Sequence, residues 1–355
     1  MSKVWEAIVI GGGQAGLASG YYLEKEGLDY LILEANEQAT GSWPNYYDSL
    51  KLFSPARFSS LPGMKFPGDP DHYPSKMEVI DYLMDYKKHF NLSVMANQRV
   101  VSVKSKAQVF EVLTESGETF HARTIINATG SFNNPFIPFI KGQETFQGRI
   151  IHSSDYRNPD PFINHRVLVV GSRNSAVQIA IELAEVSKTT LAVRKPVQLI
   201  RQRFLGQDLH FWIRAIGIDT FPFWRFGKKP LISSSVANLN NYEERLASGK
   251  PNQQPMFISF YDNGVIWPDG KKEQVDTVIY ATGFRYNLDY LSDLGALDNE
   301  GKPMEIAGIS TSVPGLYYVG LEGQRSFASA TLRGVGPDSR FIVRKLRRHL
   351  KNNRY

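Results

Sequence analysis

The chain of 355 residues is long enough for two domains with separate cores, and its 42% apolar and 21% charged content is ordinary for a globular enzyme. Lys and Arg number 41 against 35 Asp and Glu, but six of the basic residues lie in the last twelve positions, 344–355, and account for the whole excess of +6. A broad nucleic-acid-binding face is therefore excluded. Cysteine is absent, which excludes disulfides, thiolate metal sites, cysteine nucleophiles and redox-active dithiols.

Targeting and metal-binding patterns are absent as well. The N-terminus shows no basic region followed by an apolar stretch and a cleavage site, and no apolar run approaches 18 residues. The seven histidines form no H-x-x-x-H or similar pattern. We expect a soluble, cytoplasmic protein without a metal site.

A dinucleotide-binding pattern opens the chain. A short apolar run at 7–10 predicts a strand, followed by the turn 11–16, a helix that stops at Gly27, and a second strand at 30–33 that ends at Glu34. Three glycines have separate roles in such a turn: the first permits it, the second lets the backbone approach a pyrophosphate, and the third lets the helix pack on the strand. A carboxylate at the end of the next strand accepts hydrogen bonds from a ribose diol. The predicted site comprises Gly11, Gly13, Gln14, Ala15, Gly16 and Glu34.

The same order of elements then occurs a second time. Strands expected at 100–103, 109–113 and 124–127 complete the first copy, which ends in Ala128, Thr129 and Gly130. In the second copy a strand at 167–170 leads into the turn 171–176, a helix to about Ser187 and a strand at 190–193, and the copy ends in Ala281, Thr282 and Gly283. The sequence therefore predicts an α/β fold with two Rossmann-like dinucleotide-binding domains, each with a β-meander.

The second turn differs from the first in its charged residues. Arg194 and Lys195 stand at the strand end where the first copy has an acid, and cations there favour the ribose 2′-phosphate of NADP over NAD. The alternative is a solvated pair of charges in front of Pro196. Arg173 occupies the middle-glycine position, where its guanidinium either pairs with phosphate or weakens nucleotide binding; the sequence leaves both open.

The segment between the two copies carries a family resemblance. Phe146, Gly148, His152, Tyr156 and Arg157 match the fingerprint F-x-G-x-x-x-H-x-x-x-[Y/F]-[K/R], so the chain resembles the class B flavin-containing monooxygenases. Tyrosine at 156, where Baeyer–Villiger enzymes have tryptophan, makes it more similar to the branch that oxygenates nitrogen and sulfur, and to the short bacterial flavoproteins of that branch. We expect His152 to be a hydrogen-bonded structural residue of the interdomain linker, not a catalytic one.

The resemblance implies both a domain plan and a reaction. Residues 1–156 plus 287–355 would form the FAD-binding domain, and 157–286 the NADP-binding domain, with an aromatic-rich insert at 204–226. NADPH would reduce FAD, and the reduced flavin would react with O₂ to give a C4a-(hydro)peroxide that oxygenates a small soft nucleophile such as an amine or a sulfide. An NAD(P)H oxidase, or an electron-transfer flavoprotein reductase without substrate oxygenation, remains the alternative.

The resemblance also implies which residues contact the cofactors. No catalytic residue is identified, but Phe53, Ser54 and Trp43 are candidates for lining the flavin, and many family members place an asparagine where Phe53 or Ser54 stands. The flavin pyrimidine is expected near Gln324 and the turn 333–336. The full FAD set is Gly11, Gly13, Gln14, Ala15, Gly16, Glu34, Ser42, Trp43, Val100, Ala128, Thr129, Gly130 and Gln324, and the NADPH set is Ser172, Arg173, Asn174, Ser175, Arg194 and Lys195.

Two further segments are distinctive. The insert 204–226 holds seven Phe and Trp residues, and its apolar spacing predicts a short helix that Gly217 ends. It could form a lid over a substrate pocket, a dimer contact, a membrane-surface anchor or ordinary core of the NADP domain; a homodimer and membrane contact therefore stay open. The C-terminal segment predicts a helix with Pro337 at its start and with Phe341, Ile342 and Leu346 facing inward.

Overall fold

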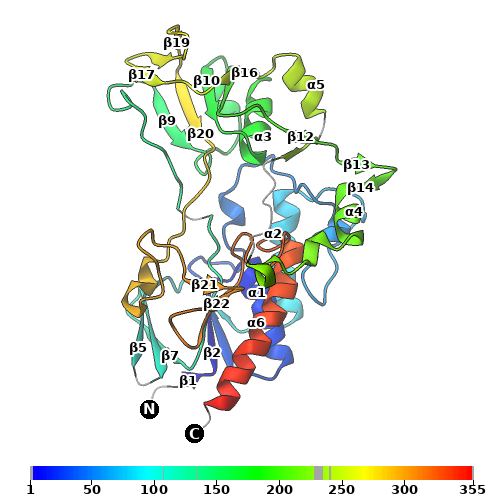
Figure 1. Ribbon diagram of the computed structural model, residues 1–355, viewed down its shortest axis with the longest axis vertical. Helices are drawn as coiled ribbons and strands as arrows, with labels where there is room; N and C mark the ends of the chain where they lie inside the picture. Colours follow the sequence, from blue (N-terminus) through cyan, green and yellow to red (C-terminus); the bar gives the residue numbers. More distant parts are fainter. Residues whose placement is uncertain (1–2, 107, 133, 228–234, 240, 354–355) are drawn as a thin grey trace.

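The computed structural model describes residues 3–106, 108–132, 134–227, 235–239 and 241–353. Two α/β units are stacked along the long axis of the molecule, and both chain ends lie in the first unit, at the end farthest from the second (Figure 1). We call the unit that contains the N-terminal strands the first unit and the other the second unit. Among the residues in these ranges, no helix is both long and apolar enough to cross a lipid bilayer.

The first unit is built on a seven-stranded sheet with the order β21-β22-β23-β8-β2-β3-β4. Its parallel centre is β2, whose neighbours are β3 and β8, and every residue of these three strands is buried, as expected for a sheet covered on both faces. The strands are β2 (Ala7–Ile10), β3 (Tyr30–Leu33), β4 (Val94–Met95), β8 (Ile125–Asn127), β21 (Glu305–Ile306), β22 (Ile309–Ser310) and β23 (Leu316–Tyr318).

Helices cover one face of this sheet and a smaller sheet lies against the other. Residues of α1 (Gln14–Lys25), α2 (Lys76–His89) and α6 (Leu332–Asn352) share one hydrophobic cluster with β2 and β3. On the opposite side, a four-stranded sheet and η6 (Asp289–Leu294) form a second cluster. The small sheet has the order β1 (Val4–Trp5), β7 (Thr119–Ala122), β6 (Val109–Thr114) and β5 (Val100–Lys106); the short helices η1 (Trp43–Asn45) and η2 (Ala56–Phe58) precede α2.

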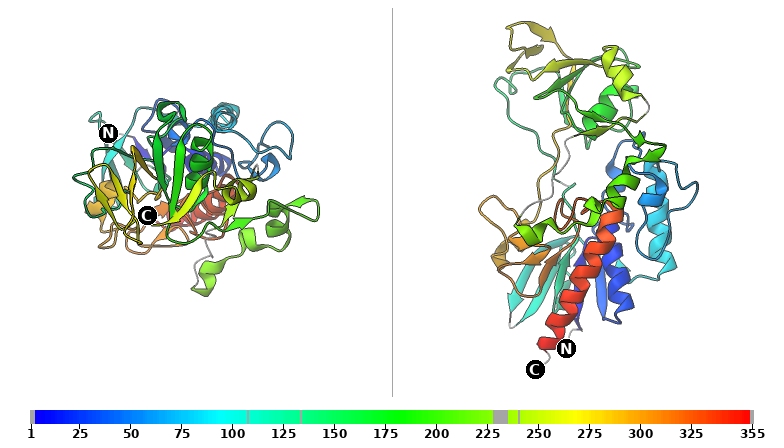
Figure 2. Two further views of the ribbon diagram at one scale, coloured as in Figure 1. Left: turned by 90° about the horizontal axis from the view of Figure 1, so that it is seen from above. Right: turned by 45° about the vertical axis from the view of Figure 1, so that its right-hand side comes forward.

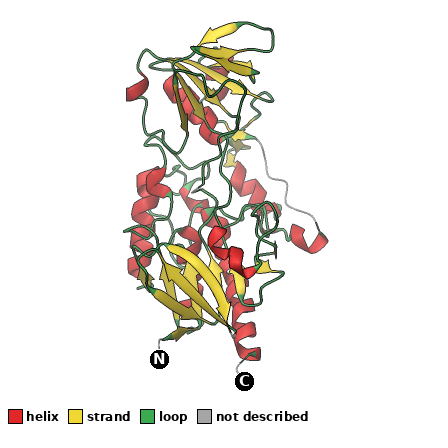
Figure 3. Cartoon of the chain, turned by 90° about the vertical axis from the view of Figure 1, so that its left-hand side faces the viewer, coloured by secondary structure: helices red, strands yellow, loops and turns green. Residues whose placement is uncertain are grey.

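The second unit repeats this plan with a five-stranded parallel sheet (Figure 3). α3 (Asn174–Leu183) and α5 (Tyr242–Ala247) cover one face, and a three-stranded meander covers the other. The predicted α/β fold with two dinucleotide-binding units is therefore confirmed. The sheet has the order β16 (Asn252–Pro255), β11 (Lys188–Val193), β10 (Arg166–Val170), β20 (Thr277–Tyr280) and β9 (Arg149–His152); η3 (Asp160–Phe162) precedes β10, and the meander is β17 (Ser259–Tyr261), β18 (Gly264–Ile266) and β19 (Lys272–Gln274).

The boundary expected at residue 156 falls too late in the chain. Strand β9 pairs in parallel with β20, so the first half of the fingerprint is an edge strand of the second sheet rather than a linker. Its two consecutive isoleucines, Ile150 and Ile151, suit a strand of this kind, but the glycine and histidine motif around them concealed it.

The C-terminal helix also begins earlier than expected. Helix α6 starts at Leu332, so Pro337 lies inside it and not at its start. A proline there removes the hydrogen bond to the carbonyl of Arg333, in the first turn of the helix. Ile342 and Leu346 are fully buried as predicted, while Phe341 is only half-buried and packs against Trp224.

The insert 204–226 extends outward from the body of the molecule (Figure 2). It begins with a two-stranded hairpin and continues into α4, which ends just before Gly217 at a φ of +77°, as its spacing predicted. Its elements are β13 (Arg203–Phe204), β14 (Gln207–Asp208), α4 (Leu209–Ala215), η4 (Ile218–Thr220) and η5 (Phe223–Phe226), and the paired strands β12 (Leu199–Ile200) and β15 (Val236–Ala237) connect it to the second unit.

Candidate active site

The first glycine turn leaves no room for side chains. Gly11 has a φ of +102°, and a Cβ on it would lie 2.8 Å from the carbonyl oxygen of Ala128. A Cβ on Gly16 would lie 1.9 Å from the carbonyl oxygen of Gly11, and one on Gly13 would lie 3.2 Å from the Cα of Gly41. The turn, the helix and the neighbouring strand end are therefore packed backbone to backbone, which is the arrangement that a pyrophosphate cradle requires.

Glu34 lies at the end of β3, directly against this turn. Its buried carboxylate accepts hydrogen bonds from the N–H of Gly12 (2.6 Å) and the N–H of Asn36 (2.8 Å), one on each oxygen. A carboxylate has about four acceptor positions, so each oxygen retains one for a ligand. The residue at the N-cap of α1 is Gly13, without a side-chain cap, which leaves the first N–H groups of the helix open to an anion. These features fit the adenosine and pyrophosphate of a dinucleotide.

Gln14 and Trp43 tie the turn to distant parts of the chain. The Gln14 amide donates to the carbonyl of Ala330 (2.6 Å) and accepts from the indole N–H of Trp43 (3.2 Å). Ser42 precedes Trp43, and its hydroxyl lies 3.5 Å from the Tyr46 hydroxyl. The structure thus brings Ser42 and Trp43 to the predicted site from a loop that carries no nucleotide motif.

Ala128, Thr129 and Ala15 of the predicted FAD set lie at the first glycine turn and its helix. Ala128 and Thr129 lie against Gly11, while Ala15 lies 2.9 Å from where a Cβ on Gly320 would stand. Gly130 follows them with a φ of +67°, and Val100 packs in the hydrophobic cluster that holds Leu33, next to Glu34.

Gln324 and Arg333 were expected near the flavin pyrimidine. The Gln324 amide is buried, donates to the carbonyl of Tyr318 (2.7 Å) and accepts from the N–H of Leu321 (3.2 Å), so half of its bonding capacity is used within the chain. Arg333 differs, because its Nη1 is buried and no described residue accepts a hydrogen bond from it. A buried guanidinium nitrogen without a partner fits an acceptor supplied by a cofactor.

The second glycine turn packs like the first at its first glycine but carries an exposed arginine at its middle position. Gly171 has a φ of +146° and packs against the carbonyl of Ala281, as Gly11 packs against Ala128. Arg173 is the N-cap of α3 with extended backbone, and its side chain is 63% exposed and reaches to within 3.8 Å of Glu322 in the first unit. Its guanidinium therefore lies beside a carboxylate of the first unit, and both expected effects on a bound phosphate stay predictions.

The other residues of the predicted NADPH set surround this turn. Ser172, Asn174 and Ser175 lie in the turn and the first residues of α3, and all three are partly exposed. Arg194 and Lys195 directly follow β11 and are exposed, so both cations are accessible to a 2′-phosphate.

A crevice between the two units is lined by residues of both. Ser42 comes from the first unit, Ser175 from the second, and Ser153 and Ser154 from the fingerprint. The crevice is lined by Ser42, Asn45, Tyr46, Tyr47, Phe132, Ser153, Ser154, Ser175 and Phe284. Ser175 of the second glycine turn thus faces the segment 42–47 of the first unit across this crevice.

His152 is held as a structural residue, as expected. Its Nε2 lies 2.9 Å from the carbonyl oxygen of Gly283, to which it donates, and its Nδ1 accepts from the N–H of Ser154 (3.1 Å). Burial lowers the pKa of His152, so the ring stays neutral. In this tautomer it joins β9 to the end of the second Ala-Thr-Gly segment.

The rest of the fingerprint connects the two units. The buried Tyr156 donates to the carboxylate of Glu182 on α3 (2.7 Å), and the Arg157 guanidinium donates to the carbonyl of Asn45 in the first unit (2.8 Å). The N–H of Asp48 in turn donates to the carbonyl of Arg157 (2.8 Å). The second half of the fingerprint is therefore a docking element between the units.

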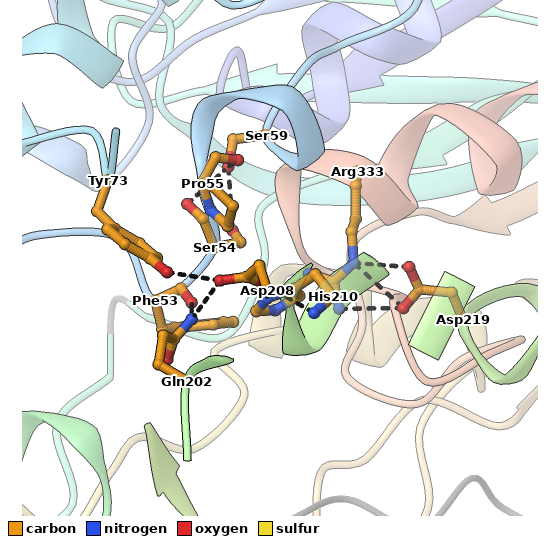
Figure 4. Close-up of polar contacts among 10 residues, drawn as sticks. All are labelled: Phe53, Ser54, Pro55, Ser59, Tyr73, Gln202, Asp208, His210, Asp219 and Arg333. Atoms are coloured by element: carbon orange, nitrogen blue, oxygen red, sulfur yellow. Dashed lines mark hydrogen bonds and ion pairs between the residues drawn. The ribbon is translucent and has the colours of Figure 1, made fainter. Parts of the chain in front are cut away.

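A buried polar cluster that the sequence did not indicate lies beside Phe53 (Figure 4). The Asp208 carboxylate accepts from the hydroxyl of Tyr73 (2.5 Å), the amide of Gln202 (2.9 Å), and both the N–H (2.8 Å) and the Nδ1 (2.8 Å) of His210. Burial alone would raise the pKa of Asp208, but these hydrogen bonds outweigh it and lower the pKa to about 2.

The candidates Phe53 and Ser54 lie next to this cluster. The Phe53 ring stacks on the His210 ring with centroids 6.0 Å apart, and its carbonyl accepts from Gln202 (3.0 Å). The Ser54 hydroxyl is 3.0 Å from that of Ser59 and is buried. Neither side chain therefore offers a free donor where many family members have an asparagine.

The insert is fixed to the first unit rather than to the second. Besides the bond from Tyr73 to Asp208, a buried ion pair joins Asp219 of η4 to Arg333 of α6, with N···O distances of 3.0–3.2 Å (Figure 4). One of the alternatives was that the insert packs as ordinary core of the NADP domain. Its buried bonds to Tyr73 and Arg333 of the first unit do not fit that alternative. Sequence analysis did not identify Asp208, His210 or Asp219. A D-x-H spacing and a single aspartate are too common to indicate a site.

The Asp208 cluster makes the position of the insert depend on pH. Because the pKa of Asp208 falls from 3.8 to about 2 on folding, its contribution of about 2 kcal/mol is complete above about pH 5 and is lost progressively as the pH falls through 2. We expect amide hydrogen exchange of 204–226 to accelerate over this range, after correction for the intrinsic rate. An Asp208→Asn variant should exchange faster at neutral pH and show no further change; a parallel response of both proteins would contradict the assignment.

Comparison with known proteins places the chain in a family. Residues 8–217 match the family of the pyridine nucleotide-disulphide oxidoreductases. An uncharacterized CzcO-like oxidoreductase of Geobacillus kaustophilus is 34% identical over 98% of this chain and 100% of its own length. The probable indole-3-pyruvate monooxygenase YUCCA8 of Arabidopsis thaliana is 28% identical, over 92% and 86% of the two chains.

A solved structure agrees with these sequence relatives. A flavin-containing monooxygenase from Stenotrophomonas maltophilia superimposes with a TM-score of 0.87 and 31% identity, covering 98% of this chain and 99% of that one. Since cysteine is absent here, the dithiol chemistry in the broader family's description has no residues to perform it. The chain belongs to the pyridine nucleotide-disulphide oxidoreductase family and is a flavoprotein oxidoreductase of the flavin-containing monooxygenase type, whose members use FAD and NADPH.

Proposed function

We propose that this chain is an NADPH-consuming monooxygenase that transfers one atom of O₂ to a small soft nucleophile, such as an amine or a sulfide, and releases the other as water. The observation that carries the proposal is the crevice in which Ser42 of the first unit and Ser175 of the second lie together with Ser153 and Ser154 of the fingerprint. A nicotinamide bound along the second glycine turn and a flavin bound along the first would meet there.

The contacts described above support an assignment of residues to each cofactor. Gly11, Gly13, Gly16 and Glu34 hold the adenosine and pyrophosphate of FAD, while Ser42 and Trp43 flank the flavin. Asn174, Ser175, Arg194 and Lys195 face NADPH. When bound, FAD accepts hydride and supplies the reaction with O₂. The chain itself orients both cofactors, and the rings of Phe132 and Phe284 form part of the crevice wall.

A second hollow, open to solvent and about 430 Å³ in volume, lies next to the Asp208 cluster. None of its lining residues belongs to the predicted FAD or NADPH set, so it does not indicate the size of a substrate. Its wall includes Tyr73, which also bonds to Asp208. The lining residues are Lys51, His72, Tyr73, Ser75, Glu78 and Leu239.

An NAD(P)H oxidase or an electron-transfer flavoprotein reductase is the second candidate, and the stacking of Phe53 on His210 favours it. A phenyl ring donates no hydrogen bond, and Ser54 is engaged with Ser59, so stabilisation of an oxygenated flavin by this segment is weak.

Rapid mixing of the NADPH-reduced protein with oxygenated buffer distinguishes the two candidates. A transient species absorbing at shorter wavelength than oxidised flavin, together with incorporation of one ¹⁸O from ¹⁸O₂ into an aryl methyl sulfide, would support the monooxygenase. Direct return of the oxidised spectrum with one H₂O₂ per NADPH would support the oxidase. Rapid oxidation by an added one-electron acceptor without either signature would support the reductase.

NADPH preference provides a separate prediction. Arg194→Ala should raise the KM for NADPH by about tenfold or more and leave the KM for NADH within about twofold, because only NADPH has a 2′-phosphate to pair with the guanidinium. Steady-state oxidation of both cofactors measures this. Lys188→Ala, which removes an exposed cation at the opposite end of β11, is the matched control and should change neither value. Equal effects of Arg194→Ala on both cofactors would show that no 2′-phosphate contact exists.

A further inference from the structure

The insert exposes more large apolar side chains than any comparable stretch of the described chain. Seven of the 19 large apolar residues that are exposed lie within these 23 positions. Leu205 is 76% exposed, Ile216 66% and Phe226 64%. These side chains therefore lie mostly in solvent and are not the rim of a packed core. The seven are Phe204, Leu205, Phe211, Ile216, Ile218, Phe221 and Phe226.

The tip of the hairpin is the clearest case. Strands β13 and β14 pair Phe204 with Gln207, which places Leu205 and Gly206 at the turn. Leu205 has a φ of +49°, a conformation that costs a leucine about 1 kcal/mol, and its side chain is in water. Neither its backbone nor its side chain stabilises the folded chain, so the tip is suited to a contact outside it.

The charges on this surface have a single sign. Arg201, Arg203, Arg214 and Arg225 are exposed, whereas the two acids of the segment, Asp208 and Asp219, are buried and bonded to residues of the body. We call the seven apolar residues and these four arginines the insert patch. Beyond it, Trp224 packs on Phe341, and the ammonium of Lys345 lies 5.6 Å from the centroid of that ring, so the positive character continues along α6.

The position of the patch suits a flat partner. Viewed from above, the insert reaches beyond the rest of the molecule on one side (Figure 2, left), and it does so from the hairpin tip to η5. The buried bonds of Asp208 and Asp219 hold its inner side against the first unit, so the outer side is presented without unfolding.

We propose that the insert patch docks on the surface of an anionic lipid bilayer, with the apolar side chains entering the interface and the arginines pairing with lipid phosphates. Exposed aromatic and aliphatic residues interspersed with cations are the composition of interfacial anchors. A second copy of the chain fits less well, because a two-fold symmetric contact would place four arginines against four arginines with no exposed acid in the patch to neutralise them.

The proposal predicts salt-sensitive binding to acidic vesicles. The full-length, FAD-loaded protein is sedimented with vesicles of phosphatidylcholine alone and with vesicles that contain about 30% phosphatidylglycerol. We expect binding to the second kind and not to the first, with loss of binding in high salt because the Debye length shortens. Equal binding to both kinds, or to neither, would overturn the proposal.

Two variants assign the binding to the patch. Arg214→Gln should lower the partition coefficient about fivefold, and Leu205→Ser about tenfold or more. The matched control is Phe139→Ser, which removes a 78% exposed apolar side chain outside the insert and should not change binding. All three residues are exposed, so flavin content and thermal unfolding verify that the variants are folded. A similar loss in all three, or a concentration-dependent dimer that Leu205→Ser abolishes while vesicles remain unbound, would contradict lipid docking.

Discussion

Gly16→Ala is expected to abolish flavin retention and to lower the thermal stability of the first unit. The added Cβ would stand 1.9 Å from the carbonyl oxygen of Gly11, and neither backbone can retreat because Gly11 itself lies against Ala128. A clash of this kind with backbone atoms lowers the free energy of unfolding by about 3 kcal/mol or more, and it opens the turn where the pyrophosphate is expected. The ratio of flavin to protein absorbance after purification, with a thermal melt, measures both effects.

Gly20→Ala is the control for this prediction, one turn farther along α1. A Cβ there would meet the tip of the Ile32 side chain at 2.7 Å, which is a flexible neighbour, and alanine favours the helix. This variant should retain its flavin with a melting temperature close to that of the parent. If both variants kept flavin equally well, the close approach of helix and turn would have no bearing on cofactor binding.

Asp219→Asn should destabilise the first unit by about 3–5 kcal/mol. The change leaves the Arg333 guanidinium buried without its counter-charge, and its Nη1 already has no partner among the described residues. Urea unfolding followed by far-ultraviolet circular dichroism gives the shift in midpoint. Asp293→Asn, which breaks an exposed pair with Lys104 at 3.8 Å, should change stability by less than about 0.5 kcal/mol.

A double variant separates the charge effect from a packing effect. Arg333→Met combined with Asp219→Asn removes the unpaired charge and should recover much of the lost stability, even where flavin affinity falls. Additive losses in the double variant would show that the ion pair does not anchor the insert to α6.

Local rules made most of the fold predictable. Strands 7–10 and 30–33 match β2 and β3 at both ends, because buried parallel strands read as continuous apolar runs that a turn or an acid then terminates. Both glycine turns follow from backbone geometry alone, since Gly11 and Gly171 pack against the carbonyl that precedes each Thr-Gly pair. The agreement was poorer at β9, where a functional motif masked a strand, and at Pro337, which lies inside α6.

The part of the site that sequence could not predict is held together by long-range contacts. Asp208 and Tyr73 are 135 residues apart, and Asp219 and Arg333 are 114 apart, so no periodicity or spacing links them. His210 gains its position on Phe53 only after the insert crosses from the second unit to the first. Arg173 was ambiguous for a similar reason, because its direction depends on Glu322 of the other unit.

The placement of β23 has a consequence for the order in which the chain folds during synthesis. Strand β8 ends at Asn127, but its neighbour on one side, β23, begins only at Leu316, after the whole second unit has been made. The second sheet, from β9 to β20, is therefore complete on the ribosome while β8 still presents an unpaired edge. We expect nascent chains from which β20 has left the ribosomal tunnel, but β23 has not, to hold a folded second unit and a first unit that aggregates or recruits chaperones until α6 emerges.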